Sequence, residues 1–382
     1  MEKRESFLSY GSQWIEEDDI TKVVETLKSP FLTQGPKVEE FEEAVAAYVG
    51  AEYAVAFANG TAALHGACHV AGISVGDEVI TTPITFAATS NSVLYCGGTP
   101  VFADIDTKTY NIDPVEIKRK ITSKTKAIIP VDFTGQPVDM DKIMEIADEN
   151  HLIVIEDGAH SLGAKFKGKK VGARAHMTMF SFHPVKPITT AEGGIITTNS
   201  KDYYNRLKLF RSHGIEKTSF SEEQGDWYYE MVDLGYNYRM TDFQAALGIS
   251  QLTKLDRFID RRHNIAEMYN KLLSDIPGLI LPEQLEGTES GWHLYMMQLD
   301  SRLIQKSRKE VFEEMRSLNI GVHVHYIPVY WHPYYKSLGF AKGLCPKAEM
   351  WYEQALTLPI FPRMKDEDVV SVVEALREVI KG

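Results

Sequence analysis

The sequence predicts an α/β fold built around a mostly parallel sheet. Between residues 53 and 159, short apolar segments alternate with segments of helical periodicity. Several of the short segments are apolar almost throughout, which is typical of parallel strands that helices cover on both faces. A chain of 382 residues is also longer than one hydrophobic core usually serves, so we expect two domains.

Two helices are predicted ahead of the first strand. The segment "EEDDITKVVETLKS" (16–29) has helical spacing and acidic residues in its first turn, where the helix dipole favours them. The segment "PKVEEFEEAVAAYVG" (36–50) has a proline at its start and a glycine at its end, as helices often do.

The predicted strands are rich in β-branched and apolar residues. In order they cover 53–58, 78–83, 99–105, 126–133, 152–159, 177–182 and 195–198. The helices between the first five strands cover 61–72, 87–97, 113–122 and 140–151.

Beyond residue 200 the pattern changes. Residues 240–273 form a long helical stretch that we expect to be broken once, and the remainder predicts a small α/β unit ending in a helix at 365–380. We place the domain boundary near residue 250. The large domain, with its N-terminal arm, would cover 1–250 and the small C-terminal domain 251–382.

The bulk composition argues against several classes of protein. The net charge of −12 disfavours binding to nucleic acid or to a membrane surface, although a small pocket can still be locally positive for an anionic substrate. The three cysteines lie far apart without a CxxC pair, so we expect a reducing compartment. Without an apolar leader or a run of about 18 apolar residues, we expect a cytoplasmic protein.

One lysine stands in an unusual setting. Lys186 lies between Pro184 and Pro187, on a loop that joins two predicted buried strands. Lysine is usually a solvated surface charge, and the prolines bar a helix and stiffen the loop. A lysine held rigidly in such a place suggests a chemical role.

A phosphate site is predicted at the first strand-to-helix junction. Asn59 and Gly60 permit a tight turn, and Thr61 and Ala62 then open a helix. The free N–H groups at a helix N-terminus can bind phosphate. An ordinary capped helix is the alternative interpretation.

A second polar position ends a central strand. Asp157 follows Glu156 and the four apolar residues 152–155, at the carboxyl end where parallel-sheet enzymes place functional groups. A buried carboxylate there needs a cation or hydrogen-bond donors, and His160 lies three residues further on. The structural alternative is an aspartate that caps the next helix.

These features together match the polar demands of pyridoxal 5′-phosphate (PLP). The lysine amine would form a Schiff base with its aldehyde, the aspartate would pair with its ring nitrogen, and the helix N-terminus would hold its phosphate. Phe86, after another strand, could cover the ring or simply pack in the core. Ser181 is placed to add a hydroxyl to the phosphate site.

Other cofactors are less well supported. His323 and His325 would share one face of a strand and His332 follows, so a metal pair is geometrically possible. Because no matching Cys, Asp or Glu follows, we expect no metal and interpret this segment as a polar, aromatic substrate wall. The sequence contains no GxGxxG motif, which disfavours a nicotinamide cofactor.

The chain resembles the sugar aminotransferases of the DegT/DnrJ/EryC1/StrS family, which have the aspartate-aminotransferase fold (PLP-dependent transferase fold type I). The resemblance covers nearly the whole chain. It rests on seven segments in one order: "FLTQGPKVEEFE" (31–42), "NGTAALH" (59–65), "TTPITFAAT" (81–89), "EDGAHSLGA" (156–164), "FSFHPVKPITTAEGG" (180–194), "LGYNYRMTDFQAALGISQL" (234–252) and "HYIPVY" (325–330).

The resemblance implies roles for matching positions. Lys186 would carry the cofactor and shuttle the proton, Asp157 would bind the pyridine nitrogen, and His160 the ring hydroxyl, where many relatives have glutamine. The phosphate would be held by Thr61, Ala62 and Ser181 and the ring covered by Phe86. Asn237 would reach the phosphate of the neighbouring subunit, so the resemblance implies a homodimer with shared active sites.

The resemblance also implies a substrate pocket. Residues in segments that line the sugar site of relatives are Tyr10, Gln34, Lys37, His325 and Tyr326. Arg239 could meet a diphosphate or a carboxylate, or it could form a structural ion pair.

Within the family, "FSFHPVKPITTAEGG" and "FRSHGI" (210–215) most resemble the branch of the pseudaminic acid pathway. This implies a UDP-4-keto-6-deoxy-N-acetylhexosamine as substrate, L-glutamate as donor, PLP and its amine form PMP as cofactor states, and UDP-4-amino-4,6-dideoxy-N-acetyl-β-L-altrosamine as product. Pro184 stands where some close relatives carry a small apolar residue.

Three alternatives remain open at this point. The substrate could be another nucleotide 4-keto or 3-keto sugar, such as a UDP-bacillosamine precursor or a dTDP-sugar. Family members that remove a 3-hydroxyl carry histidine in place of the Schiff-base lysine, so Lys186 favours transamination. A non-catalytic sensor of cofactor or nucleotide sugar is the second alternative, and the intact Lys186, Asp157 and Ser181 argue against it. The third is an NAD-dependent dehydrogenase, which the missing GxGxxG motif disfavours.

Overall fold

The computed structural model describes residues 3–381, and its centre is a seven-stranded sheet. β9 alone runs opposite to its neighbours, and the other strand pairs are parallel. The prediction of an α/β fold with a mostly parallel seven-stranded sheet is confirmed. From edge to edge the strands are β1 (Tyr53–Phe57), β9 (Gly194–Thr198), β8 (Met177–Ser181), β5 (Ile153–Asp157), β4 (Thr125–Ile129), β2 (Glu78–Thr81) and β3 (Thr99–Phe102).

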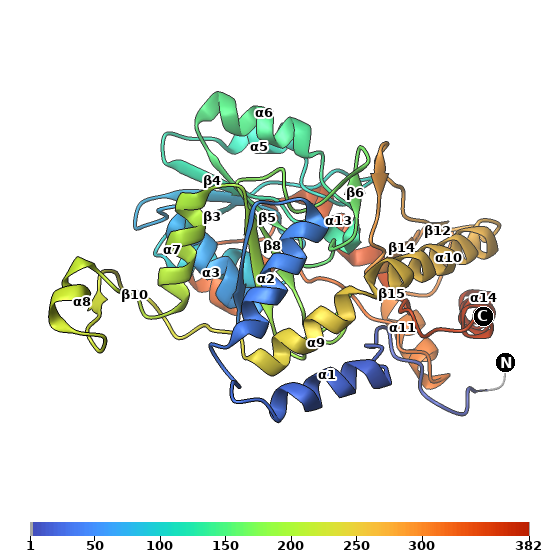
Figure 1. Cartoon of the computed structure of the whole chain (residues 1–382). Coiled ribbons are helices and arrows are strands. Elements are labelled where there is room, and N and C mark those ends of the chain that lie inside the picture. The colour runs from blue at the N-terminus through green and yellow to red at the C-terminus, as the bar shows by residue number, and fades with distance from the viewer. Residues whose placement is uncertain (1–2, 382) are drawn as a thin grey trace.

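Helices cover both faces of this sheet (Figure 1). Along β1, Val55 packs into one core together with side chains of α3 and α7, whereas Ala54 and Ala56 pack into another together with side chains of α2 and α9. This alternation is what a strand covered on both faces requires. The helices of this part are α1 (Glu17–Leu27), α2 (Pro36–Val49), α3 (Gly60–Val70), α4 (Ala88–Tyr95), α5 (Pro114–Lys120), α6 (Met140–Asn150) and α7 (Lys201–Arg211).

Several predicted strands are longer than the observed ones, and the difference is largest for β4. β4 ends at Ile129, whereas the apolar run predicted a strand to residue 133. Pro130 follows and has no N–H to donate to the ladder, so the regular strand ends there, although Val131 still forms an isolated parallel bridge with Asp157. The chain then turns through the short 3₁₀ helix η1 (Phe133–Gly135).

The C-terminal part begins with the long helical stretch, which is broken once, as predicted, at residues 253–254. It builds a second core around a three-stranded sheet, and Leu8 of the N-terminal segment packs into that core. The elements are α9 (Asp242–Leu252), α10 (Leu255–Leu273), β12 (Leu279–Ile280), β13 (Thr288–Glu289), β14 (Tyr295–Leu299), α11 (Arg308–Ser317), η2 (Val329–Trp331), α12 (Pro333–Ser337), α13 (Pro346–Gln354), β15 (Ala355–Leu358) and α14 (Asp366–Lys381). A domain division at residue 250 stays a prediction.

A projecting arm lies between α7 and α9. It carries β10 (Ile215–Glu216), α8 (Ser219–Gln224) and β11 (Glu230–Met231), and Figure 1 shows it standing out from the rest of the molecule. Several of its apolar side chains are exposed, among them Trp227 at 79%, Leu234 at 69% and Met231 at 67%. The remaining short elements are β6 (Lys165–Phe166) and β7 (Lys169–Lys170), which form a hairpin. Within residues 3–381, no helix is both long and apolar enough to cross a membrane.

The N-terminal helix is fixed to the helix break by a buried ion pair. Asp19 is fully buried, and its carboxylate accepts hydrogen bonds from Lys254 Nζ at 2.6 Å and Gln251 Nε2 at 2.8 Å. The same lysine also reaches the exposed carboxylate of Asp18 at 2.6 Å. The two aspartates therefore share one cation but differ in burial.

Replacing Asp19 with alanine should lower the free energy of unfolding by about 3–5 kcal/mol, because removing one partner of a buried ion pair leaves the other charge uncompensated. Urea unfolding measures this loss. Asp18→Ala is the matched control and should leave the unfolding midpoint unchanged, since exposed ion pairs contribute little. Equal losses in the two variants would contradict this account of the junction.

Candidate active site

A large cavity opens at the carboxyl ends of the parallel strands. Its volume is about 780 Å³, and it is lined by residues from both the N-terminal and the C-terminal parts of the chain. The sequence-predicted residues that line it are Tyr10, Thr61, Ala62, Phe86, Asp157, His160, Ser181, Lys186, His325 and Tyr326. We refer to it as the main cavity.

Lys186, for which the sequence suggests a chemical role, lies in the wall of this cavity. The loop that carries Lys186 joins β8 to β9, and the N–H of Lys186 donates to the carbonyl of His183 at 2.9 Å. Across the base of the loop, the N–H of Thr190 donates to the carbonyl of Phe182 at 3.0 Å. Burial lowers the pKa of the Lys186 amine to about 8, although the charge of Asp157 opposes this shift.

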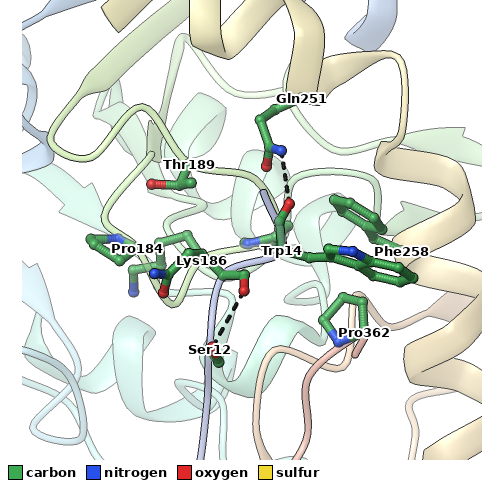
Figure 2. Close-up of a pocket in the computed structure, with 10 residues that line it drawn as sticks. Ser12, Trp14, Pro184, Lys186, Thr189, Gln251, Phe258 and Pro362 are labelled. Carbon is green, nitrogen blue, oxygen red and sulfur yellow. Dashed lines mark hydrogen bonds between the residues drawn. The ribbon is translucent and has the colours of Figure 1, made fainter. Parts of the chain in front are cut away.

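The underside of the same loop rests on the N-terminal segment. Figure 2 shows Ser12 and Trp14 of that segment beside Lys186, in a small pocket behind the loop. Gln251 Nε2 donates to the Trp14 carbonyl at 2.9 Å, and the Trp14 ring stacks on Phe258 at 5.4 Å between centroids. The segment is thereby fixed to α9 and α10, so the loop has a rigid support.

Asp157 is the carboxylate of the site. It ends β5, is only 4% exposed, and lines the main cavity. Thr89 Oγ1 donates to Oδ2 at 2.7 Å and the N–H of Ala159 donates to Oδ1 at 3.2 Å. Burial raises the pKa of the Asp157 carboxyl, while these donors and the charge of Lys186 hold the rise down.

The start of α3 forms a cradle with the end of β8. Asn59 caps the helix, and its Oδ1 accepts from the N–H of Ala62 at 2.8 Å. A Cβ at Gly60 would lie 3.2 Å from the Ser181 Cβ, so the lack of a side chain lets the helix start approach that serine. A helix N-terminus beside a hydroxyl can bind a phosphate group.

Histidines also line the main cavity. His160 Nε2 is 3.4 Å from the Tyr326 hydroxyl, and its buried Nδ1 has no partner among the described residues. Burial and the charges of Lys186 and His325 lower the pKa of His160 well below its usual value. His160 is therefore neutral near pH 7 and can both donate and accept a hydrogen bond.

The residues of the main cavity fit PLP. A buried carboxylate, a buried amine of lowered pKa, an unpartnered imidazole nitrogen and a phosphate cradle correspond to its ring nitrogen, aldehyde, hydroxyl and phosphate. Phe86 lines the cavity and is 63% exposed, so its ring is not held in the core, the alternative left open by the sequence.

Four predicted residues lie outside the main cavity of this chain. Asn237 is exposed at the base of the projecting arm, where it forms a backbone bridge with Ser212. Gln34 is exposed with φ of +57°, and Lys37 pairs with Glu40 at 2.5 Å. Arg239 is half-buried, and its buried Nε has no hydrogen-bond partner in the part of the chain that is described.

The segment with three histidines differs from its prediction. Residues 322–328 form no strand, and the pairing there is an isolated bridge between His323 and Thr357. The rings of His323 and His325 stack at 4.4 Å and both line the main cavity. Between residues 3 and 381, no group of three or more His, Cys, Asp or Glu side chains is arranged to hold a metal ion.

Sequence reasoning missed several residues of the cavity. Thr89, His183, Glu192 and His293 line it and were not predicted. Thr89 lies in the quoted segment "TTPITFAAT", but only the fold brings it against the strand that ends in Asp157. His293 lies two residues before the apolar strand β14, and no local signal marks it.

Comparison with protein families gives one match over most of the chain. A model of the DegT/DnrJ/EryC1/StrS aminotransferase family matches residues 13–377. Spore coat polysaccharide biosynthesis protein SpsC of Bacillus subtilis is 42% identical over 386 residues, covering 100% of this chain and 99% of that protein. UDP-4-amino-4,6-dideoxy-N-acetyl-β-L-altrosamine transaminase of Campylobacter jejuni is 37% identical over 377 residues, covering 98% of each.

Solved structures show the same architecture. PseC of Helicobacter pylori, an aminotransferase involved in the biosynthesis of pseudoaminic acid, superposes with a TM-score of 0.92 at 32% identity, covering 98% of this chain and 100% of that chain. The PLP-form of Spr1654 from Streptococcus pneumoniae, a putative sugar aminotransferase, gives a TM-score of 0.91 at 30% identity, covering 98% of this chain and 99% of that chain.

The amine of Lys186 should become reactive at unusually low pH. Its rate of acetylation in cofactor-free protein, followed by mass spectrometry of the peptide, should rise with a midpoint near pH 8. Asp157→Asn should move this midpoint to lower pH, because the carboxylate charge is what raises the pKa of the amine. A midpoint that moves to higher pH in this variant would contradict the assigned electrostatics, and an exposed lysine such as Lys309 is the internal reference.

Proposed function

This chain belongs to the DegT/DnrJ/EryC1/StrS aminotransferase family, and we propose that it moves the amino group of L-glutamate onto C4 of a UDP-4-keto-6-deoxy-N-acetylhexosamine. In its general activity, the protein is a PLP-dependent sugar aminotransferase. The proposed product is UDP-4-amino-4,6-dideoxy-N-acetyl-β-L-altrosamine, an intermediate for pseudaminic acid. The observation that carries the proposal is that a partly buried lysine of lowered pKa and a buried aspartate line the same cavity and act on each other electrostatically.

Cofactor binding is proposed for one set of side chains. Thr61, Ala62 and Ser181 would hold the phosphate, Asp157 the ring nitrogen and His160 the ring hydroxyl, with Phe86 against the ring. PLP, when bound, supplies an aldehyde that exchanges amino groups and a ring that takes up electrons. The lining of the main cavity by all six residues supports this set.

Lys186 is proposed as the catalytic base. Its Nζ would take the proton from the α-carbon of glutamate and return a proton to C4 of the sugar in the second half of the cycle. A base works best when its pKa lies near the working pH, and burial brings that of Lys186 to about 8. Asp157 would stay ionised beside a cation, and it would keep the ring nitrogen protonated.

A further set of residues is proposed to bind the sugar substrate and the amino donor. Tyr10, His325 and Tyr326 line the main cavity and are proposed to contact the sugar. Gln34, Lys37 and Arg239 lie outside it, and we propose that they act in the site of a second subunit. The buried Nε of Arg239 has no hydrogen-bond partner among the described residues, so a ligand carboxylate or diphosphate is the proposed partner.

The main alternative to the proposed substrate is a different nucleotide sugar. The Bacillus spore coat polysaccharide protein is more similar, at 42% identity, than the Campylobacter transaminase, at 37%. A panel of UDP- and dTDP-linked 4-keto and 3-keto sugars therefore has to accompany the proposed substrate. The proposed sugar should give the highest kcat/KM, and a higher value with another member would replace it.

Replacing Lys186 with alanine should abolish turnover, and Asp157→Ala should lower kcat by about 100-fold or more, because each removes a charge that acts on the reacting atoms. Turnover is followed by 2-oxoglutarate release, and cofactor binding by visible absorbance. Lys309→Ala, on the exposed face of α11, is the control and should retain full activity. A rate near that of the wild type for Lys186→Ala would sink the mechanism.

The homodimer is proposed to share its active sites through Asn237, which would reach the phosphate bound by the partner subunit. The exposed apolar side chains of the arm support a covered surface there. Asn237→Asp should inactivate the enzyme, because its charge would repel the phosphate.

Mixing the two inactive proteins tests this sharing. In a mixed dimer of Asn237→Asp and Lys186→Ala chains, one of the two sites has both residues intact. Random re-pairing should therefore recover roughly a quarter of the wild-type rate. A mixture that stays inactive after subunit exchange, or a fully active monomer in sedimentation, would overturn the shared site.

A further inference from the structure

His293 is a buried histidine of the main cavity to which the proposed function gives no role. It is 4% exposed, and its ring centroid lies 4.3 Å from that of His160, with 42° between the ring planes. The Nδ1 atoms of both rings are buried without a partner among the described residues. Because buried polar atoms are nearly always paired, two unpaired nitrogens in one cavity wall indicate more than packing.

The backbone beside His293 is held in an unfavourable conformation. Trp292 has φ of +43°, in the left-handed region that a bulky residue rarely adopts. The preceding residue is tied to η1, since the N–H of Gly291 donates to the carbonyl of Gly135 at 2.8 Å. A Cβ at Gly135 would lie 2.9 Å from both the Trp292 nitrogen and the His160 carbonyl oxygen. Glycine at this position thus allows the two histidine-bearing segments to approach.

A buried cation fixes this segment from behind. Arg262 on α10 is 1% exposed, and its Nη1 donates to the carbonyls of Trp292 at 3.1 Å, His293 at 3.3 Å and Ile360 at 3.0 Å. No carboxylate is recorded as its partner within residues 3–381. A buried charge is unfavourable unless it is compensated, so hydrophobic packing alone gives no reason for an arginine here.

We propose that His293 is a positioning residue for His160, which it holds in the orientation needed to meet the bound cofactor. The strained turn and the Arg262 clamp hold His293 in turn. The inference rests on the proposed function, because His160 finds its missing hydrogen-bond partner only when the cofactor occupies the cavity.

The surroundings of the pair favour uncharged rings. The Tyr326 hydroxyl faces His160. Burial disfavours protonation of both rings, and the positive charge of Lys186, together with that of Arg262 for His293, acts in the same direction. With burial, these charges hold the pKa of both histidines well below the usual value. A neutral imidazole keeps one donor and one acceptor, so its orientation decides what it offers to a ligand.

The test is a double-mutant cycle between the two histidines. His293→Phe keeps an aromatic ring and removes both nitrogens. It should raise the dissociation constant of PLP about tenfold and shift the visible absorbance of the bound cofactor, as expected when a supporting residue is lost. In the His160→Gln background, the same substitution should change the dissociation constant by less than about twofold, because its effect passes through His160.

Control variants distinguish a failure of the positioning role from misfolding and from a failure of the proposed function. His332→Phe, outside the main cavity, should leave the dissociation constant and the absorbance unchanged. Unchanged binding in His293→Phe, or an equal loss in both backgrounds, would overturn the positioning role. If His293→Phe does not fold, the cycle is run with His293→Gln, to which the same two criteria apply. Wild-type protein that binds no PLP would instead refute the proposed function.

Discussion

The burial of a lysine amine and an aspartate carboxylate in one cavity is the constraint on which the rest of the site depends. Burial lowers the pKa of Lys186 and raises that of Asp157, and each charge partly offsets the shift of the other. The carboxylate also needs the donors that Thr89 and Ala159 supply. Removing any of these groups would leave an uncompensated polar atom in a buried wall.

The sheet places these groups through its strand order. β5 and β8 are parallel neighbours, so Asp157 and Ser181 leave the sheet at the same edge. β9 follows β8 in the chain and pairs antiparallel with it, so the lysine lies on the loop that joins these two strands, and the N-terminal segment supports this loop. Both parts of the chain are needed, because His293, His325 and Tyr326 complete the cavity from the C-terminal part.

The sequence predicted the sheet and the centre of the site because both leave local signals. Asp157 ends an apolar strand, and Lys186 lies between two prolines on the loop that joins two apolar strands; a charge in either place is unusual enough to suggest a function. Thr89 and His293 carry no such signal, since their role arises only when distant segments meet. The early end of β4 was marked by Pro130, which outweighs the apolar run around it. The two-residue strands of the C-terminal part are too short for any periodicity to mark them.

The central claim is that Lys186 is the residue that bonds to the cofactor. Borohydride reduction of the holoenzyme fixes such a bond, and mass spectrometry of the digested protein then locates the pyridoxyl group. The account predicts a single modified peptide that contains Lys186, and none in protein reduced after the cofactor has been removed. A pyridoxyl group on another lysine, or none on any lysine of protein that binds PLP, would contradict the account.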